Sequence, residues 1–182
     1  AKLRPPPARK RKIRLVLLSE PPNPPPTEPP GCLSAASRDW LKAADPARRK
    51  AHGQYLTPRP VAEALLDRLE LKPGMKLLDP GAGTGELLRA AIDREPGLEA
   101  HGWDDAPAPI AAARSLVPEA RLELRSAFEA PAEAGFDLVI GNPPYFQLQL
   151  AKALRDRFAG VISGRANAVA LFFQVGLQQL RA

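Results

Sequence analysis

The chain has 182 residues, 45% hydrophobic and 25% charged, which is long enough for one domain with a buried core. No apolar run approaches the roughly 20 residues of a membrane-spanning helix, and the single cysteine, Cys32, excludes an internal disulfide. With only two histidines besides, the chain has no metal-ligand spacing, so we expect no metal site. The single cysteine also fits a cytoplasmic protein.

The positive charge and the prolines are concentrated near the N-terminus. Residues 1–60 contain 13 Lys or Arg against 4 Asp or Glu, a net charge of +9, whereas residues 61–182 contain 13 against 16, a net charge of −3. Thirteen of the 22 prolines also precede residue 61. We therefore predict a disordered, basic, proline-rich arm over 1–36 and a folded domain over 37–182. The arm is either a solvated tail or a polycation that adds salt-dependent affinity for nucleic acid.

The folded part begins with a short helix near residue 38, which breaks at Pro46 and leads into a basic turn and a loop. A second helix follows over 59–71, because Pro60 suits a first helical turn and Val61, Leu65 and Leu69 share one face. Strands and helices then alternate: strands over 75–79, 98–103, 121–126 and 136–140, and helices over 85–95, 107–117 and 166–180. This alternation predicts a doubly wound α/β fold with ligands outside the carboxyl ends of its strands.

The first of these strand ends reads "LLDPGAGTGELL". Gly81, Gly83 and Gly85 allow a tight turn and a close approach of ligand to main chain. The spacing is not that of a dinucleotide site, and Asp79 directly before the loop favours a ligand with a positively charged amino group. The alternative interpretation is an ordinary strand-to-helix turn.

The next strand ends in "GWDD". Asp104 lies about 20 residues beyond the glycine loop, where an acid can accept hydrogen bonds from both hydroxyls of a ribose. Asp105 is interpreted as a cap of the following helix. The alternative is that Asp104 and Asp105 are both solvated residues of a turn.

The order "GQYLTP", "LLDPGAGTGELL", "GWDD", "FDLVIGNPPY" resembles the gamma-type N6-adenine DNA methyltransferases of restriction-modification systems. The resemblance covers roughly residues 50–182 and implies a Rossmann-like class I methyltransferase sheet, S-adenosylmethionine as methyl donor and DNA as partner, with no membrane association. That family continues beyond the equivalent of Ala182 with more strands and a target-recognition domain. We therefore expect a truncated chain whose sheet is incomplete at the C-terminus.

The resemblance also implies roles for individual residues. Tyr55 and Thr57 would touch the methionine carboxylate, and the acid with its glycine loop would hold the amino acid portion. Asp104 would bind the ribose and Phe172 would pack against the cofactor adenine. The family usually has an acid for the adenine amino group where this chain has Ser126, a weaker acceptor. The implied cofactor-binding set is Tyr55, Thr57, Asp79, Gly81, Gly83, Gly85, Asp104, Ser126 and Phe172.

The corner "NPPY" is the implied catalytic element, comprising Asn142, Pro143, Pro144 and Tyr145. The Asn142 side-chain oxygen and the Pro143 carbonyl would each accept a hydrogen from the target amino group, and Tyr145 would stack on the extruded base. The same corner serves glutamine methyltransferases of release factors and some RNA base methyltransferases, since both targets present a planar NH2. A further alternative is a non-catalytic remnant or binding module of a restriction-modification system.

Overall fold

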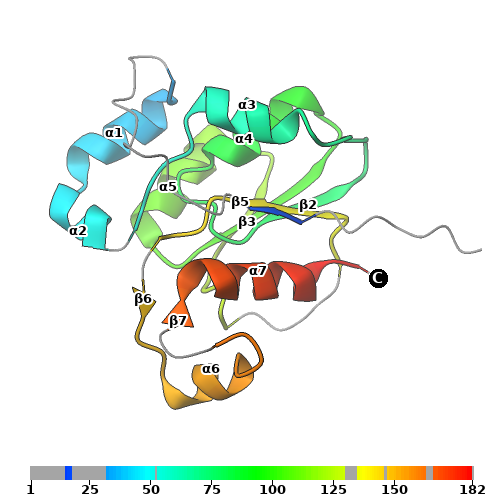
Figure 1. Cartoon of the computed structure of the whole chain (residues 1–182). Helices are drawn as coiled ribbons and strands as arrows, with labels where there is room; N and C mark the ends of the chain where they lie inside the picture. Colours follow the sequence, from blue (N-terminus) through cyan, green and yellow to red (C-terminus); the bar gives the residue numbers. More distant parts are fainter. Residues whose placement is uncertain are drawn as a thin grey trace, which may run out of the picture.

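A parallel sheet forms the centre of the protein. The computed structural model describes residues 15–17, 32–51, 53–129, 135–145, 147–162 and 166–181. Within these residues, five strands form one sheet in the order β1-β5-β2-β3-β4, and every neighbouring pair is parallel (Figure 1). The strands are β1 (Leu15–Leu17), β2 (Lys76–Asp79), β3 (Glu99–Asp104), β4 (Arg121–Leu124) and β5 (Leu138–Gly141). The predicted parallel α/β sheet is confirmed, and its strands all end on one side of the molecule.

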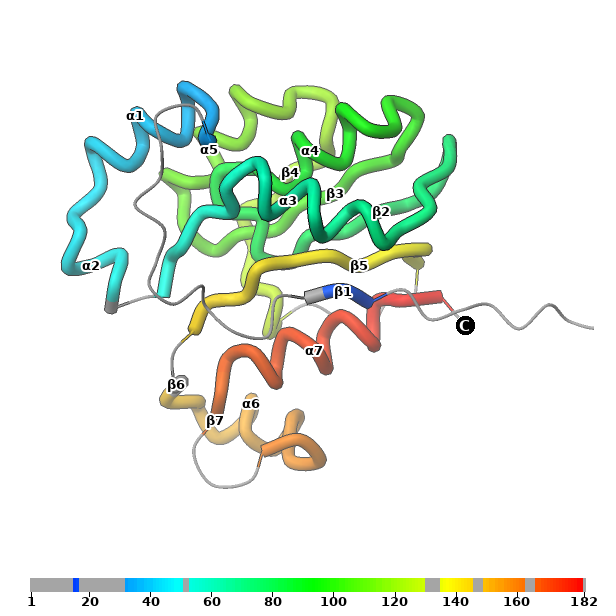
Figure 2. Tube along the Cα trace, turned by 45° about the horizontal axis from the view of Figure 1, so that its top comes forward, coloured from blue at the N-terminus to red at the C-terminus, as the bar shows by residue number. Residues whose placement is uncertain are grey.

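Helices cover both faces of this sheet. On one face lie α1 and α3 to α5, whereas α7 lies on the other face against β1 and β5 (Figures 1 and 2). The helices are α1 (Ala35–Ala43), α2 (Pro46–Ala51), α3 (Arg59–Leu66), α4 (Glu86–Arg94), α5 (Pro107–Leu116), α6 (Lys152–Arg157) and α7 (Ala168–Gln179). All four residues of β5 are buried, as expected for a strand covered on both faces. No helix among the described residues is long and apolar enough to cross a membrane.

Local sequence explains where the site-bearing helices begin. Gly85 precedes α4 with φ of +87°, a left-handed conformation that side chains rarely adopt. A Cβ on Gly85 would also lie 3.1 Å from the Val117 side chain and 3.3 Å from that of Ala113. Gly85 therefore allows both the turn and the close packing of α4 against α5. At α7, the Asn167 side chain accepts a hydrogen bond from the Val169 N–H and caps the helix.

The helix expected over 59–71 ends at Leu66, as α3, and three further features differ from the sequence-based expectations. The first helix ends before Pro46 as expected, but the segment expected to be a basic turn is the helix α2, which Pro46 begins and where its missing N–H costs no hydrogen bond. Asp105 does not cap α5, whose preceding residue Ala106 makes no side-chain cap. A small antiparallel pair, β6 (Gln147–Leu148) and β7 (Ala166–Asn167), accompanies α6 beyond β5. Periodicity gave no sign of these short elements.

The prediction of an arm without packing over 1–36 is wrong for the residues of it that the structure describes. Leu15–Leu17 form the edge strand β1, and a Cβ on Gly176 of α7 would lie 2.6 Å from the Leu15 side chain. Leu33 is buried and α1 begins at Ala35. Packing against β5 and α7 explains the strand, because three apolar residues do not specify one alone. Residues 1–14 and 18–31, which contain 10 of the 22 prolines, lie outside the described residues.

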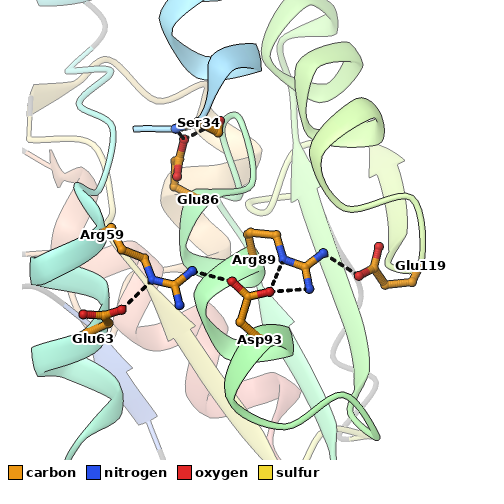
Figure 3. A network of polar contacts seen from close by, with 7 residues as sticks. All are labelled: Ser34, Arg59, Glu63, Glu86, Arg89, Asp93 and Glu119. Atoms are coloured by element: carbon orange, nitrogen blue, oxygen red, sulfur yellow. Dashed lines mark hydrogen bonds and ion pairs between the residues drawn. The ribbon is translucent and has the colours of Figure 1, made fainter. Parts of the chain in front are cut away.

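A chain of ion pairs joins the helices on the outer face of α3 and α4 (Figure 3). Arg59 contacts Glu63 at 2.7 Å and Asp93 at 2.5 Å, and Arg89 contacts Asp93 at 2.7 Å and Glu119 at 2.5 Å. These side chains are between 24% and 50% exposed, so solvent screens each pair and each contributes about 0 to 1 kcal/mol. The network orients neighbouring helices and lies away from the carboxyl ends of the strands.

Candidate functional site

A cavity of about 230 Å³ lies at the carboxyl ends of the strands, and a smaller pocket of about 30 Å³ adjoins it. Most of the residues predicted to bind a ligand line one or both. The cavity is lined by Tyr55, Gly81, Gly83, Asp104, Ser126, Asn142, Pro144 and Phe172, and the smaller pocket by Thr57 and Asp79 together with Tyr55, Gly81, Gly83 and Asn142. Gly85, Pro143 and Tyr145 line neither.

Asp79 ends β2 inside the smaller pocket. Its side chain is 2% exposed and its Oδ1 accepts a hydrogen bond from the Gly81 N–H at 3.0 Å. Burial raises the pKa of Asp79 to about 7. The hydrogen bond from the Gly81 N–H lowers this pKa, whereas the nearby charge of Asp104 raises it. Among the described residues no Lys or Arg forms an ion pair with Asp79. A cationic ligand group at this position would stabilise the ionised carboxylate.

Asp104 ends β3 and holds the glycine loop. Its Oδ2 accepts from the Gly83 N–H and its Oδ1 from the Ala106 N–H, both at 2.9 Å. Burial raises the pKa of this carboxyl too, and the two backbone N–H groups oppose the rise. Each carboxylate oxygen has a second lone pair, so both can still accept a hydrogen bond from a ribose hydroxyl. Asp105, beside it, faces the same cavity.

Aromatic rings form the wall on the α7 side of the cavity. Phe172 lies against the glycine loop, since a Cβ on Gly81 would be 3.0 Å from its Cε1. Phe128 meets Phe172 edge to face, with ring centroids 5.0 Å apart and planes at 82°. Ser126 lines the cavity two residues before Phe128 and accepts the Phe128 N–H at 3.3 Å. This wall is apolar with one hydroxyl, which suits a flat heterocycle.

The corner after β5 lies against the segment around Thr57. The Asn142 Nδ2 donates to the Thr57 hydroxyl at 3.2 Å and to the Tyr55 carbonyl at 3.4 Å. The Tyr145 hydroxyl donates to the Asn142 Oδ1 at 2.9 Å, and the rings of Tyr55 and Tyr145 lie 6.4 Å apart. Because a carbonyl can only accept, the amide edge facing Tyr55 must be the NH2 group. The Asn142 oxygen therefore points to the opposite side, where Tyr145 lies.

Sequence reasoning missed several residues of this site. Trp40, Gln54, Asp105 and Phe128 line the cavity, and Glu86 lines the smaller pocket. Asp105 was recognisable only as the neighbour of Asp104. Trp40 lies in a segment whose local pattern indicates nothing beyond a helix, so its place in the site depends on tertiary packing.

Comparisons with known proteins agree with this geometry. Residues 108–182 match the model of the Eco57I restriction-modification methylase family. A structure from Listeria monocytogenes, solved as a class I S-adenosylmethionine-dependent methyltransferase, superposes with a TM-score of 0.61 at 20% identity, covering 77% of this chain and 46% of that one. The chain has the class I methyltransferase fold.

Two curated relatives are methyltransferases with different names. The release factor glutamine methyltransferase of Caulobacter vibrioides is 31% identical, over 54% of this chain and 38% of its own length. The modification methylase CviBIII of Paramecium bursaria Chlorella virus NC1A is 26% identical, over 59% of this chain and 29% of its own length. The chain thus spans less than half the length of the relatives that it matches.

The class I methyltransferase fold implies S-adenosylmethionine as cofactor, and the residues present fit it. The buried carboxyl of Asp79 lacks a cationic protein partner among the described residues, which matches the methionine ammonium group. Asp104 offers two oxygens for ribose hydroxyls, and Phe128 and Phe172 offer apolar surface for adenine. The roles of the individual residues remain predictions.

Proposed function

We propose that the protein transfers a methyl group from S-adenosylmethionine to the exocyclic amino nitrogen of adenine in DNA. The observation that carries the proposal is the Asn-Pro-Pro-Tyr corner, whose Asn142 lines both the cofactor cavity and the pocket of Asp79. The match of residues 108–182 to a restriction-modification methylase family and the similarity to a modification methylase support DNA as the substrate.

Methylation of a base in a duplex requires its extrusion, because stacking hides the amino group. A rigid corner can hold the extruded base. Two successive prolines restrict the backbone after Asn142 and carry no N–H, so their carbonyls act only as acceptors. Tyr145 offers a ring for stacking on the base, an interaction of about 1 to 3 kcal/mol.

Chemistry at this corner depends on two acceptors. The Asn142 Oδ1 and the Pro143 carbonyl oxygen each accept a hydrogen bond from the target amino group. These two hydrogen bonds shift the nitrogen toward tetrahedral geometry and direct its lone pair at the methyl carbon. The cofactor supplies an activated methyl group on a sulfonium. With the cofactor bound, the nitrogen–carbon bond would form as the carbon–sulfur bond breaks, and the amino group would then lose a proton to solvent. Positioning and charge placement provide the acceleration.

Methylation of a protein glutamine is the second candidate function. The favouring observation is the 31% identity to a release factor glutamine methyltransferase. A glutamine side chain presents the same planar NH2 group as adenine, so the corner would bind it through the same two acceptors. The basic character of residues 1–60 favours DNA instead, because a polyanion is the complementary partner.

The acceptor can be identified by mass spectrometry. The protein is incubated with S-adenosylmethionine carrying a labelled methyl group and, separately, with unmethylated bacterial DNA, a release factor or ribosomal RNA. We expect the label in DNA, as N6-methyldeoxyadenosine after digestion to nucleosides. Asn142→Ala serves as the matched control and should incorporate far less label in the same time. Label in a release-factor glutamine or in RNA, and none in DNA, would refute the proposal.

Two roles are open to Thr57: to orient the Asn142 amide or to contact the cofactor. Its hydroxyl contacts Asn142, and the residue also lines the pocket of Asp79. If it orients the Asn142 amide, Thr57→Val should slow methyl transfer about fivefold, as expected for about 1 kcal/mol of lost hydrogen bonding, and leave cofactor affinity unchanged. Thr57→Ser, which retains the hydroxyl, should transfer methyl groups at nearly the normal rate. Single-turnover rates and calorimetric affinities measure both. Weakened cofactor binding in Thr57→Val would instead favour a contact with the methionine carboxylate.

A further inference from the structure

Helix α1 provides a wall of the cofactor cavity that the sequence does not indicate. Trp40, near the end of α1, lines the cavity together with Asp104, Asp105 and Pro109. Asp104 ends β3, and Pro109 lies in the first turn of α5, the helix that α1 contacts. Trp40 therefore lies on the side of the cavity where the ribose and adenine of the cofactor are expected.

Two polar contacts hold α1 against the glycine loop and the start of α4. Ser34 donates to the Glu86 Oε1 from its N–H at 2.8 Å and from its hydroxyl at 2.6 Å (Figure 3). One turn further on, the hydroxyls of Ser37 and Thr84 lie 2.6 Å apart and both residues are buried. Thr84 belongs to the glycine loop itself, so the helix is fixed to the segment that approaches the ligand.

Glu86 is well placed for this contact. It is buried, it lies in the first turn of α4, and it accepts from Ser34, the residue that caps α1. The carboxylate therefore faces the positive ends of two helix dipoles, which stabilises its charge. Hydrogen bonds to a carboxylate are stronger than those between neutral groups, so the two bonds from Ser34 hold α1 in a defined position.

The cavity is thereby enclosed by aromatic side chains from opposite faces of the sheet. Phe172 comes from α7 on one face and Trp40 from α1 on the other (Figures 1 and 2). The Arg49 guanidinium carbon lies 5.8 Å from the centroid of the Trp40 ring, a contact that links α2 to the same side chain.

We propose that Trp40 is a cofactor-binding residue, and that α1, docked through Ser34 and Ser37, is a clamp that presses its ring against the adenosine half of S-adenosylmethionine. The ring compensates for the weak polar contact that Ser126 offers to the adenine. This inference rests on cofactor binding alone and is independent of the methyl acceptor.

The test measures the affinity of the protein for S-adenosylhomocysteine by calorimetry. Trp40→Ala should raise the dissociation constant about tenfold, the change that corresponds to about 1.4 kcal/mol of lost stacking. Trp40→Phe, which keeps a flat ring, should stay within about threefold of the original protein. Asp39→Ala is the control, because this neighbour on α1 is exposed and pairs only with the exposed Lys42 among the described contacts.

Fluorescence separates a direct contact from a general loss of packing. The chain has two tryptophans, and Trp103 in β3 is 1% exposed, so a change in emission on binding should come from Trp40 and be absent in Trp40→Phe. Bound S-adenosylhomocysteine should also slow tryptic cleavage at Arg48, Arg49 and Lys50. An unchanged dissociation constant in a folded Trp40→Ala protein, or an unchanged emission response in Trp40→Phe, would overturn the inference. Failure of the original protein to bind S-adenosylhomocysteine would refute both the clamp and the proposed function, whereas normal binding with an indifferent Trp40 would refute the clamp alone.

Discussion

Asn142→Ala is expected to lower the single-turnover rate of DNA methylation about 100- to 1,000-fold, the usual effect of removing one preorganised polar group at a reacting centre. Affinity for S-adenosylmethionine should change little, because the proposed cofactor contacts are made by Asp79, Asp104 and the aromatic wall and not by the Asn142 oxygen. The predicted defect therefore lies in the transition state and not in cofactor binding.

Tyr145→Ala is the informative companion to Asn142→Ala. It removes a stacking surface and leaves both acceptors in place, so the rate should fall by a graded amount. A mismatch or an abasic site opposite the target adenine reduces the cost of extrusion by a few kcal/mol. It should therefore restore part of the Tyr145→Ala rate and almost none of the Asn142→Ala rate.

Matched and mismatched duplexes assayed with both variants test this division of roles. The hydrogen bond from the Tyr145 hydroxyl to the Asn142 Oδ1 makes Tyr145→Phe a useful third variant, since it keeps the ring and removes that bond. Nearly full activity in Tyr145→Phe would indicate that the ring, and not the hydroxyl, serves the reaction. Equal rescue of Asn142→Ala and Tyr145→Ala by a mismatch would show that their roles are assigned wrongly.

The affinity for S-adenosylmethionine should fall with pH below about 7. The pKa of Asp79 is raised to about 7 in the ligand-free protein, and an ammonium partner favours the ionised carboxylate. Binding must therefore release a proton at lower pH, which weakens affinity by up to about tenfold per pH unit. Asp79→Asn should reduce affinity about 10- to 100-fold at pH 7.5 and remove this dependence. Calorimetry between pH 5 and pH 7 tests it, and a flat profile in the original protein would exclude the pairing.

The same substitution should have the opposite effect on stability without cofactor. An acid whose pKa is higher in the folded than in the unfolded protein binds more protons when folded, so stability decreases as pH rises from about 4 to about 7. Asp79→Asn has no such titration. Its melting temperature should therefore exceed that of the original protein at pH 8 and approach it at pH 4. A lower melting temperature at pH 8 would mean that the carboxylate already has a favourable partner.

Elements with strong local signals were predictable from sequence, and the others were not. The strand expected over 75–79 is observed as Lys76–Asp79, and the helix expected over 166–180 as Ala168–Gln179. Both have a buried apolar centre and clear boundaries. By contrast, β1 is stabilised by pairing with β5 and by contact with Gly176, partners that are distant in the sequence. The helix α6 and the pair β6 and β7 are too short for periodicity to reveal.

Some residues of the candidate site were likewise predictable from the sequence, and others were not. Asp79, Asp104 and Asn142 each directly follow or end a strand, so a rule about strand ends located them. The Thr57 hydroxyl bonds to Asn142, and Trp40 reaches the cavity, only because separate segments dock together. The family resemblance predicts that Thr57 contacts the cofactor. The structure adds a hydrogen bond between Thr57 and Asn142 of the Asn-Pro-Pro-Tyr corner.

One edge of β5 is occupied by both ends of the described chain. Phe136, just before β5, accepts from the Arg181 N–H and donates to the Gln179 carbonyl, and Leu180 bridges it in parallel. The Asp137 N–H points the other way, to Lys76 of β2, and successive residues of a strand alternate sides, so Leu180 lies on the edge that β1 occupies. Leu15 pairs with Val139, about 10 Å further along the strand. Two segments from opposite ends of the sequence thus form one interrupted edge strand. Because both segments run parallel to β5, a linker of a few residues could join Arg181 to Leu15 along this edge, at the end of the strands opposite the cavity.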